Sequence, residues 1–542
     1  MLDVLIKNGR VIDGTGNPWY RANVGIRGDR IAYIGTLEPE ARQVVDAAGC
    51  AVTPGFWDVH THSEFQLLIE PDMLGYTFQG ITTVVSGNCS FGIYPDKRHK
   101  AQEFTPSEAG QYRDLEWSSL EGYAAPVNRK GTSVNSIPLI GHGTIRWTVM
   151  GNEQRAPRPD ELKKMEDLLR EGMRQGAAGM STGLDYVPSR FAEIEELVAL
   201  GGVLRETGGI YASHTRWVSP LYAYSYNANE VLCPTEDRAR HIEGIREAIE
   251  IGRRAEIPVQ ISHLHTSAVI GTEMAMIHQA RREGVDVTVD AMSYNVPFST
   301  LSDTLLTLTK TRSPEYADVP WEEYCAMLRR PEVRERMSRS PQYRRYFWPE
   351  TAPRWRLAQT GDPAMDGRSV GEVAKERGMS PVDLMFDLVL DRSRRILIVP
   401  PEEVLVELPR EQITDDLIMM GSDHLQGDPK DPYARTSPRG FAAVPRYLEH
   451  AQRFGQSLET TVRQLSSLPA ARFGFPERGT IAPHQIADAL VFRPEEVRGR
   501  ATMADPLQLA EGMRYVFIAG QPVIAAGKHT DRRPGRVLLR MV

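Results

Sequence analysis

Residues 56–64 read FWDVHTHSE, an apolar run that ends in a pair of histidines. The run predicts a buried strand. His60 and His62 stand two residues apart, so both imidazoles point to the same face of that strand. If that face lines a barrel, the two rings can bind one metal ion near its mouth. Taken alone, the pair is explained equally well as two satisfied polar residues at a strand end.

Seven more short apolar runs follow this one, and several are separated by helical patterns, most clearly at residues 160–175 and 237–255. Alternation of strands and helices predicts a parallel sheet of the α/β class, and eight strands fit a closed (β/α)₈ TIM barrel. An open doubly wound sheet is the alternative, but no G-x-G-x-x-G follows an early strand. The predicted strands span residues 56–62, 81–86, 136–140, 178–181, 210–214, 259–263, 285–290 and 417–423.

The two chain ends differ from this middle part. Residues 1–53 and 480–542 read as short strands broken by glycine turns, and they predict one small β-sandwich domain built from both ends. The barrel is then expected over residues 54–479. Residues 297–410 are too many for one crossover, and their aromatic content predicts a folded lid inserted into the barrel.

Composition narrows the class of protein. The 542 residues carry 64 Lys+Arg and 71 Asp+Glu, a net charge of −7, and 41% are hydrophobic, which is ordinary globular usage. We therefore expect neither nucleic acid nor a membrane as a partner. Four cysteines are too few for a disulfide scaffold, and the N-terminus lacks the apolar segment of a signal peptide, so a cytoplasmic location is expected.

Polar side chains also stand at the ends of other predicted strands. His214, His263 and Asp423 end three of them, and Cys89 follows the second. Active-site residues of barrels come from the C-terminal ends of several strands. Imidazole, thiolate and carboxylate ligands together suit zinc or a similar transition metal. The set therefore predicts a metal site.

The order of motifs resembles that of the amidohydrolase superfamily, and within it the N-acyl-D-amino-acid deacylase (D-aminoacylase) group. H-x-H alone is common, whereas the ordered set is specific and covers nearly the whole chain. The resemblance implies a barrel capped by a β-sandwich and one or two Zn²⁺ ions per chain. The matching segments are DVLIKNGRVIDGTG, VTPGFWDVHTHSE, SGNCSFG, GHGTIRWTVMG, GAAGMSTGLDYVPS, YASHTR, VQISHL, MGSDH, SSLPAARFGF, GTIAPHQIADALVF and RPGRVLLR.

The resemblance also assigns roles to the metal ligands. It groups His60 and His62 with Asp423 in one metal site, and Cys89 with His214 and His263 in the other. Many superfamily members bridge two metals with a strand-four lysine, but strand four here reads GAAGMSTGL, and Cys89 stands where the D-aminoacylase group uses a cysteine. Asp423 is expected to be both a ligand and the general acid/base for a metal-activated water.

Substrate contacts implied by the resemblance are Tyr186, His265 and Arg439. His265 stands where the group has a lysine, and a histidine is a weaker anchor for a carboxylate because it is only partly charged near neutral pH. His424 likewise replaces a usual glycine after Asp423. We therefore expect a larger or less anionic substrate than a simple N-acetyl-D-amino acid. His142 in GHGTIRW fits either a functional or a loop-fixing role.

The expected function is zinc-dependent hydrolysis of the amide bond of a small N-acyl compound, an N-acyl amino acid of D configuration if the group's preference holds. The same scaffold acting on a cyclic amide, a carbamate, a lactone or a carbon–carbon bond is the alternative. A non-catalytic scaffold is a third reading, and the loss of metal ligands would mark it. A homo-oligomer is possible.

Overall fold

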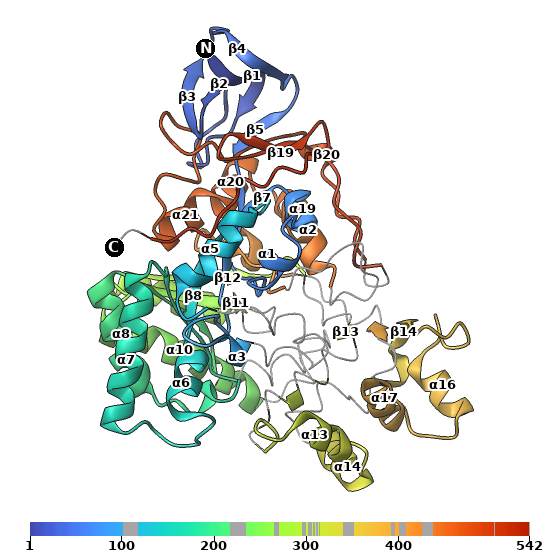
Figure 1. Ribbon diagram of the computed structural model, residues 1–542. Coiled ribbons are helices and arrows are strands. Elements are labelled where there is room, and N and C mark those ends of the chain that lie inside the picture. The colour runs from blue at the N-terminus through green and yellow to red at the C-terminus, as the bar shows by residue number, and fades with distance from the viewer. Residues whose placement is uncertain are drawn as a thin grey trace.

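The computed structural model of the protein describes residues 1–100, 117–216, 235–264, 270–294, 300–301, 306, 309–310, 313, 315–339, 352–391, 396–399, 408–424, 437–502 and 505–540. Figure 1 gives the arrangement of these parts, with the N-terminal strands at one end and an insertion, coloured yellow to ochre, at the other.

Eight parallel strands form the central sheet, and they occur where the sequence predicts them. They are β6 (Phe56–Asp58), β7 (Ile81–Ser86), β8 (Asn135–Gly141), β9 (Gly179–Gly183), β10 (Ile210–His214), β11 (Val259–Leu264), β12 (Val287–Ala291) and β16 (Ile418–Met420). Their residues are buried on both faces, as expected of a sheet covered by helices.

Main-chain hydrogen bonds close this sheet into a barrel. The Val59 N–H donates to the Met420 carbonyl at 3.1 Å, and the Asp423 N–H donates to the His60 carbonyl at 2.8 Å, so the first strand meets the last. This closure confirms the predicted (β/α)₈ barrel and excludes the open sheet.

Helices connect and cover the strands. The predicted pair is present as α7 (Pro159–Arg174) and α10 (Thr235–Ala255). The others in this part are α1 (Gln66–Ile69), α2 (Leu74–Thr77), α3 (Lys97–Lys100), α5 (Leu120–Lys130), α6 (His142–Met150), η3 (Ser189–Phe191), α8 (Ile194–Thr207), α11 (Ile270–Arg282), α18 (Glu411–Thr414), α19 (Arg439–Arg453), α20 (Leu458–Leu465) and α21 (Ser467–Phe473).

Both chain ends join in one nine-stranded sheet, which forms the β domain at the top of Figure 1. The N-terminal and C-terminal parts meet where β5 pairs antiparallel with β17. The sheet encloses an apolar core that includes Val24, Ile26 and Phe517. Its strands are β1 (Leu2–Val11), β2 (Tyr20–Arg27), β3 (Arg30–Gly35), β4 (Ala41–Asp46), β5 (Ala51–Pro54), β17 (Ala489–Phe492), β18 (Met513–Ile518), β19 (Gln521–Ala525) and β20 (Lys528–His529), with η7 (Pro494–Glu496) between β17 and β18.

The described parts of the insertion have a hydrophobic core of their own, which includes Tyr324, Trp355 and Phe386. Arg334 joins two of its helices through Asp387 at 2.6 Å. The elements are β13 (Thr300–Leu301), α13 (Trp321–Met327), α14 (Pro331–Arg339), η5 (Ala352–Arg354), β14 (Arg356–Gln359), α16 (Val370–Glu376), α17 (Pro381–Leu390) and β15 (Leu397–Val399).

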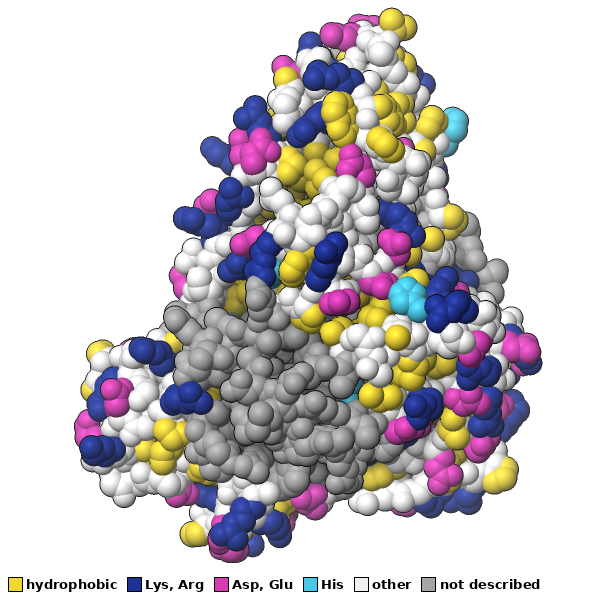
Figure 2. Space-filling model, turned by 180° about the vertical axis from the view of Figure 1, so that it is seen from behind, with side chains coloured by type: hydrophobic (Ala, Val, Ile, Leu, Met, Phe, Trp, Pro, Cys, Tyr) yellow, Lys and Arg dark blue, Asp and Glu magenta, His cyan; other side chains and the backbone are white. Residues whose placement is uncertain are grey.

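Acidic and basic side chains are interspersed on the described surface of the face drawn in Figure 2. Of the helices in the described ranges, none combines the length and the apolar character that a membrane span requires.

Candidate metal centre

The six predicted metal ligands converge at the C-terminal ends of the barrel strands. His60 and His62 follow β6, Cys89 follows β7, His214 ends β10, His263 lies near the end of β11 and Asp423 follows β16. They form two groups that could each hold a metal ion, and Cys89 belongs to both.

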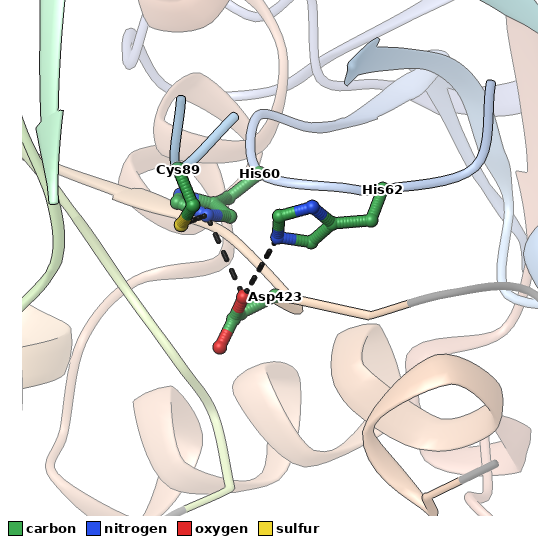
Figure 3. Close-up of side chains that lie close together, drawn as sticks. All are labelled: His60, His62, Cys89 and Asp423. Atoms are coloured by element: carbon green, nitrogen blue, oxygen red, sulfur yellow. Dashed lines mark hydrogen bonds and ion pairs between the residues drawn. The ribbon is translucent and has the colours of Figure 1, made fainter. Parts of the chain in front are cut away.

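The first group contains His60, His62, Cys89 and Asp423, drawn in Figure 3. One carboxylate oxygen of Asp423, Oδ1, lies 3.2 Å from Nε2 of His62 and 3.6 Å from Nε2 of His60. Nε2 of His60 is also 3.2 Å from Sγ of Cys89. Two imidazole nitrogens, a sulfur and an oxygen therefore face one small space.

The second group lies on the other side of the same thiol. Sγ of Cys89 is 3.6 Å from Nδ1 of His214 and 3.5 Å from Nε2 of His263. These two ring nitrogens are themselves 2.7 Å apart. Because all three donor atoms are buried and face one another, the arrangement fits ligands gathered around a cation.

Charges within the cluster lower the pKa values of its two acidic donors, Cys89 and Asp423. Burial raises the pKa of the Cys89 thiol, but His60, His214 and His263 outweigh it and hold that pKa well below its usual value. Burial likewise raises the pKa of Asp423, and Arg439 and His62 outweigh it and hold that pKa well below the ordinary one. A thiolate and a carboxylate beside imidazoles are the donor set that zinc prefers.

The loop that carries Cys89 is held by hydroxyl groups of two neighbouring elements. The Ser90 N–H donates to Oγ of Ser181 on β9 at 3.1 Å, and the Gly92 N–H donates to Oγ1 of Thr144 on α6 at 3.0 Å. The loop leaves β7 through Gly87, which has a φ of 84° and would clash with a main-chain carbonyl if it carried a side chain. Cys89 is thereby placed between the two groups.

Asp290, on β12, is a site residue that the sequence reasoning did not single out. Its Oδ1 lies 3.2 Å from Nδ1 of His60 and accepts the main-chain N–H of His263 at 2.7 Å, while Oδ2 accepts from Gln260 at 2.9 Å. Asp290 therefore contacts one member of each group. A carboxylate on the second nitrogen of a metal-binding histidine fixes the ring and its tautomer. The signal for it was an acidic residue at the end of the strand predicted over residues 285–290.

Asp185 is a second residue that was missed. Its Oδ2 lies 3.5 Å from Nε2 of His214, the ring nitrogen that faces away from Cys89. The predicted substrate contact Tyr186 is its neighbour, and the Tyr186 ring lies 4.9 Å from the His214 ring and 5.3 Å from that of Phe91. Tyr186 is thus at the edge of the candidate metal site.

Arg439, another predicted substrate contact, lies directly on Asp423. Its Nη1 is 3.3 Å from Oδ2 of Asp423 and its Nη2 donates to the Asp423 carbonyl at 2.9 Å. His424 is buried and packs over Gly440, which has no side chain to obstruct the ring. The third predicted contact, His265, lies outside the described residues.

Comparison with known proteins gives consistent matches. A family model described as "Amidohydrolase family" matches residues 43–334. The chain is 32% identical to a D-aminoacylase of Alcaligenes xylosoxydans xylosoxydans, over 99% of this chain and 98% of that protein.

Two solved structures are similar over their whole length. A D-aminoacylase crystal structure matches with a TM-score of 0.73 and 29% identity, covering 100% of both chains. The N-acyl-D-glutamate deacylase of Bordetella bronchiseptica, in complex with zinc and a phosphonate inhibitor, matches with a TM-score of 0.74 and 28% identity, covering 99% of both.

Proposed function

Because the chain belongs to the amidohydrolase family, we propose that it is a zinc-dependent hydrolase that cleaves the amide bond of an N-acyl amino acid, preferably of D configuration. The observation that carries the proposal is the pair of ligand groups that share Cys89 at the barrel mouth. The relatives support the substrate class, since they are a D-aminoacylase and an N-acyl-D-glutamate deacylase.

The six side chains of the two groups are the proposed ligands, for one or two Zn²⁺ ions per chain. When bound, zinc supplies a Lewis acid that lowers the pKa of water toward neutrality and polarises a carbonyl. The buried Cys89 thiol and Asp423 carboxyl, whose pKa values are both lowered, fit that ion. Asp290 lies 3.2 Å from Nδ1 of His60 and Asp185 lies 3.5 Å from Nε2 of His214, in each case at the ring nitrogen that faces away from Cys89.

Asp423 is the proposed general acid/base. Its carboxylate takes a proton from the attacking water and passes it to the leaving nitrogen, so that the C–N bond breaks and a carboxylate and a free amine result. Its position supports this role, because Oδ1 faces His60 and His62 while Oδ2 faces Arg439. Tyr186, Arg439 and His265 are the proposed contacts to the substrate. Because the Arg439 guanidinium contacts Asp423, a substrate group bound by Arg439 would lie next to the proposed acid/base.

A paired substrate panel tests the proposal. Zinc-loaded protein is assayed for release of free amine from N-acyl-D- and N-acyl-L-amino acids with short and bulky acyl groups, together with cyclic amides and lactones. We expect hydrolysis of N-acyl-D-amino acids above their L partners, with the bulkier or less anionic members preferred. Asp423→Asn keeps the shape but removes the base, and should be slower by about 10²-fold or more. Turnover confined to lactones or cyclic amides would contradict the proposal.

We also propose the domain limits expected from the sequence, with a β domain of residues 1–53 and 480–542, a barrel of 54–479 and a lid at about 297–410. The pairing of β5 with β17 and the separate core of the insertion support them. A cytoplasmic location is proposed because Cys50, Cys89 and Cys325 form no disulfide bond, as is usual in a reducing compartment.

A further inference from the structure

The segment that follows β9, residues 184–193, is called the strand-four loop below. Its first residues meet the metal cluster through Asp185, which lies 3.5 Å from Nε2 of His214, and through Tyr186, whose ring packs against the same imidazole. The position of this loop therefore determines where Asp185 and Tyr186 lie relative to His214.

The far end of the same loop is anchored by a buried chain of polar side chains. Oγ of Ser189 in η3 lies 2.5 Å from Nδ1 of His142, the first residue of α6. Nε2 of His142 lies 2.8 Å from Oε1 of Glu196 on α8. The other oxygen of Glu196 accepts from Arg146 at 2.5 Å, and Arg146 also donates to the carbonyl of Arg155 at 2.6 Å.

These side chains are almost completely removed from solvent. His142, Arg146 and Ser189 have no exposed surface, and Glu196 is 3% exposed. One arrangement satisfies the imidazole on both sides: its Nε2–H donates to the Glu196 carboxylate, and the Ser189 hydroxyl donates to Nδ1. Buried polar groups that lose a partner are costly, so the chain holds its members in one geometry.

A second anchor reaches the same loop from the next strand. Arg216, two residues after His214, donates to the carbonyl of Arg190 and to that of Ala192, each at 2.8 Å. Its guanidinium is itself held by Glu247 at 2.9 and 3.0 Å. Side chains from two elements therefore anchor the loop: His142 at the start of α6 and Arg216 just after β10.

We propose that His142 is a positioning residue, which acts through Ser189 on the strand-four loop and so places Asp185 and Tyr186 against His214. The inference rests on the proposed function, because the loop matters for catalysis only if the ligand groups bind zinc and the site hydrolyses a substrate. It assigns to a buried histidine outside the ligand set an effect on zinc retention and on substrate binding.

Ser189→Ala is the sharpest test, since it cuts the link to the loop and leaves the His142–Glu196–Arg146 chain in place. The matched control is Ser466→Ala, which removes a buried hydroxyl bonded to the Val462 carbonyl at 2.6 Å, away from the loop. His142→Ala completes the series. Each variant is measured for zinc retained against increasing chelator, for kcat and KM at saturating zinc, and for thermal midpoint.

We expect Ser189→Ala to raise KM about tenfold and to release zinc at about tenfold lower chelator, as the loss of one hydrogen bond predicts. His142→Ala should do at least as much, and the double variant should add little, because both act on one link. Ser466→Ala should match the parent in KM and zinc retention, even where its thermal midpoint falls.

Parent-like KM and zinc retention in Ser189→Ala would overturn the proposal, as would equal losses in Ser466→Ala, which would mark a general effect of stability. If His142→Ala does not fold, Ser189→Ala still decides. If the parent hydrolyses no amide, the proposed function fails on its own, and the zinc-retention comparison continues to test the positioning role.

Discussion

Three of the proposed ligands lie on left-handed backbone: φ is 51° at Cys89, 37° at His263 and 51° at Asp423. Such a conformation costs a non-glycine residue about 1–3 kcal/mol, and it persists only where the surrounding structure enforces it. The register of β11 against β12 shifts between Ile261 and Leu264, which turns the side chain of His263. The three strained residues all belong to the ligand groups, and strained backbone of this kind often occurs at functional sites.

Cys89→Ser tests the shared thiolate, because a hydroxyl has similar volume but is a poor ligand for a borderline-soft ion. We expect zinc affinity and turnover each to fall about tenfold or more. Cys50→Ser is the control, since Cys50 is a buried free thiol in the core of the β domain. Zinc titration of both variants by fluorescence competition measures the effect. A Cys89→Ser protein that binds zinc like Cys50→Ser would remove Cys89 from the ligand set.

Asp290→Asn tests the carboxylate that contacts both groups. The asparagine amide keeps the shape of the carboxylate but has only one oxygen. That oxygen can face His60 and His263, or it can face Gln260, but not both sides at once. Removing such a partner typically costs 10–100-fold in metal affinity or activity. We expect a loss in that range in zinc retention and kcat. Asp167→Asn, on the exposed face of α7, should change neither, and an unaffected Asp290→Asn protein would show that this contact is dispensable.

At the residue scale, the proposed ligands could be singled out from the sequence, whereas the acidic residues that contact them could not. The proposed ligands stand at predicted strand ends in motifs that resemble those of the amidohydrolase superfamily, so their roles could be assigned from the sequence. Asp290 ends a predicted strand but stands in none of the matching motifs, and Asp185 lies in a loop. The histidine that each contacts is distant in the sequence. Only the folded barrel brings them together.

Among the elements, strand ends differ most from expectation. Regular pairing of the first strand ends at Asp58 rather than His62, because the next residues bond alternately to two different strands. The Val59 N–H donates to Met420 of β16, and the Thr61 N–H donates to Val85 of β7. The strand closes the barrel there between two neighbours. Helix α7 agrees within a residue of the prediction, since Pro159 and the acidic first turn signal its start.

The start of α7 gives a prediction about pH. Glu161 accepts a paired hydrogen bond from Arg155 at 2.7 and 2.9 Å, and the Arg158 N–H at 2.8 Å. Arg155 foremost, then Arg158, lowers the pKa of Glu161 to about 2. A carboxyl whose pKa is lower in the folded protein stabilises above its unfolded value near 4.5, and that stabilisation is lost as the pH falls toward 2.

Glu161→Gln should therefore lower the thermal midpoint at pH 6 to 7, and the difference from the parent should shrink steadily below pH 4.5. Thermal unfolding followed by circular dichroism between pH 7 and the lowest pH at which the parent folds measures this. A difference that stays constant across that range would mean that the charge of Glu161 contributes nothing.

On the scale of the whole molecule, the C-terminal tail is hydrogen-bonded to the barrel. Ser136 at the start of β8 exchanges main-chain hydrogen bonds with Arg536 and Leu538 at 2.9 and 2.8 Å, and the Arg540 N–H donates to Gly176 at 2.8 Å. The two-ended β domain was predictable from its turn patterns. The contact of the tail with the barrel was not, because it joins positions about 400 residues apart with no shared pattern.

The central claim is that this barrel mouth hydrolyses amides with zinc held by its histidines, Cys89 and Asp423. The most direct measurement is a titration of metal-free protein with zinc while amine release from a preferred N-acyl-D-amino acid is followed. We predict no turnover at the start, and a rise that saturates at one or two equivalents of zinc per chain. Full turnover by the metal-free protein, or zinc binding that never produces amide hydrolysis, would contradict the account.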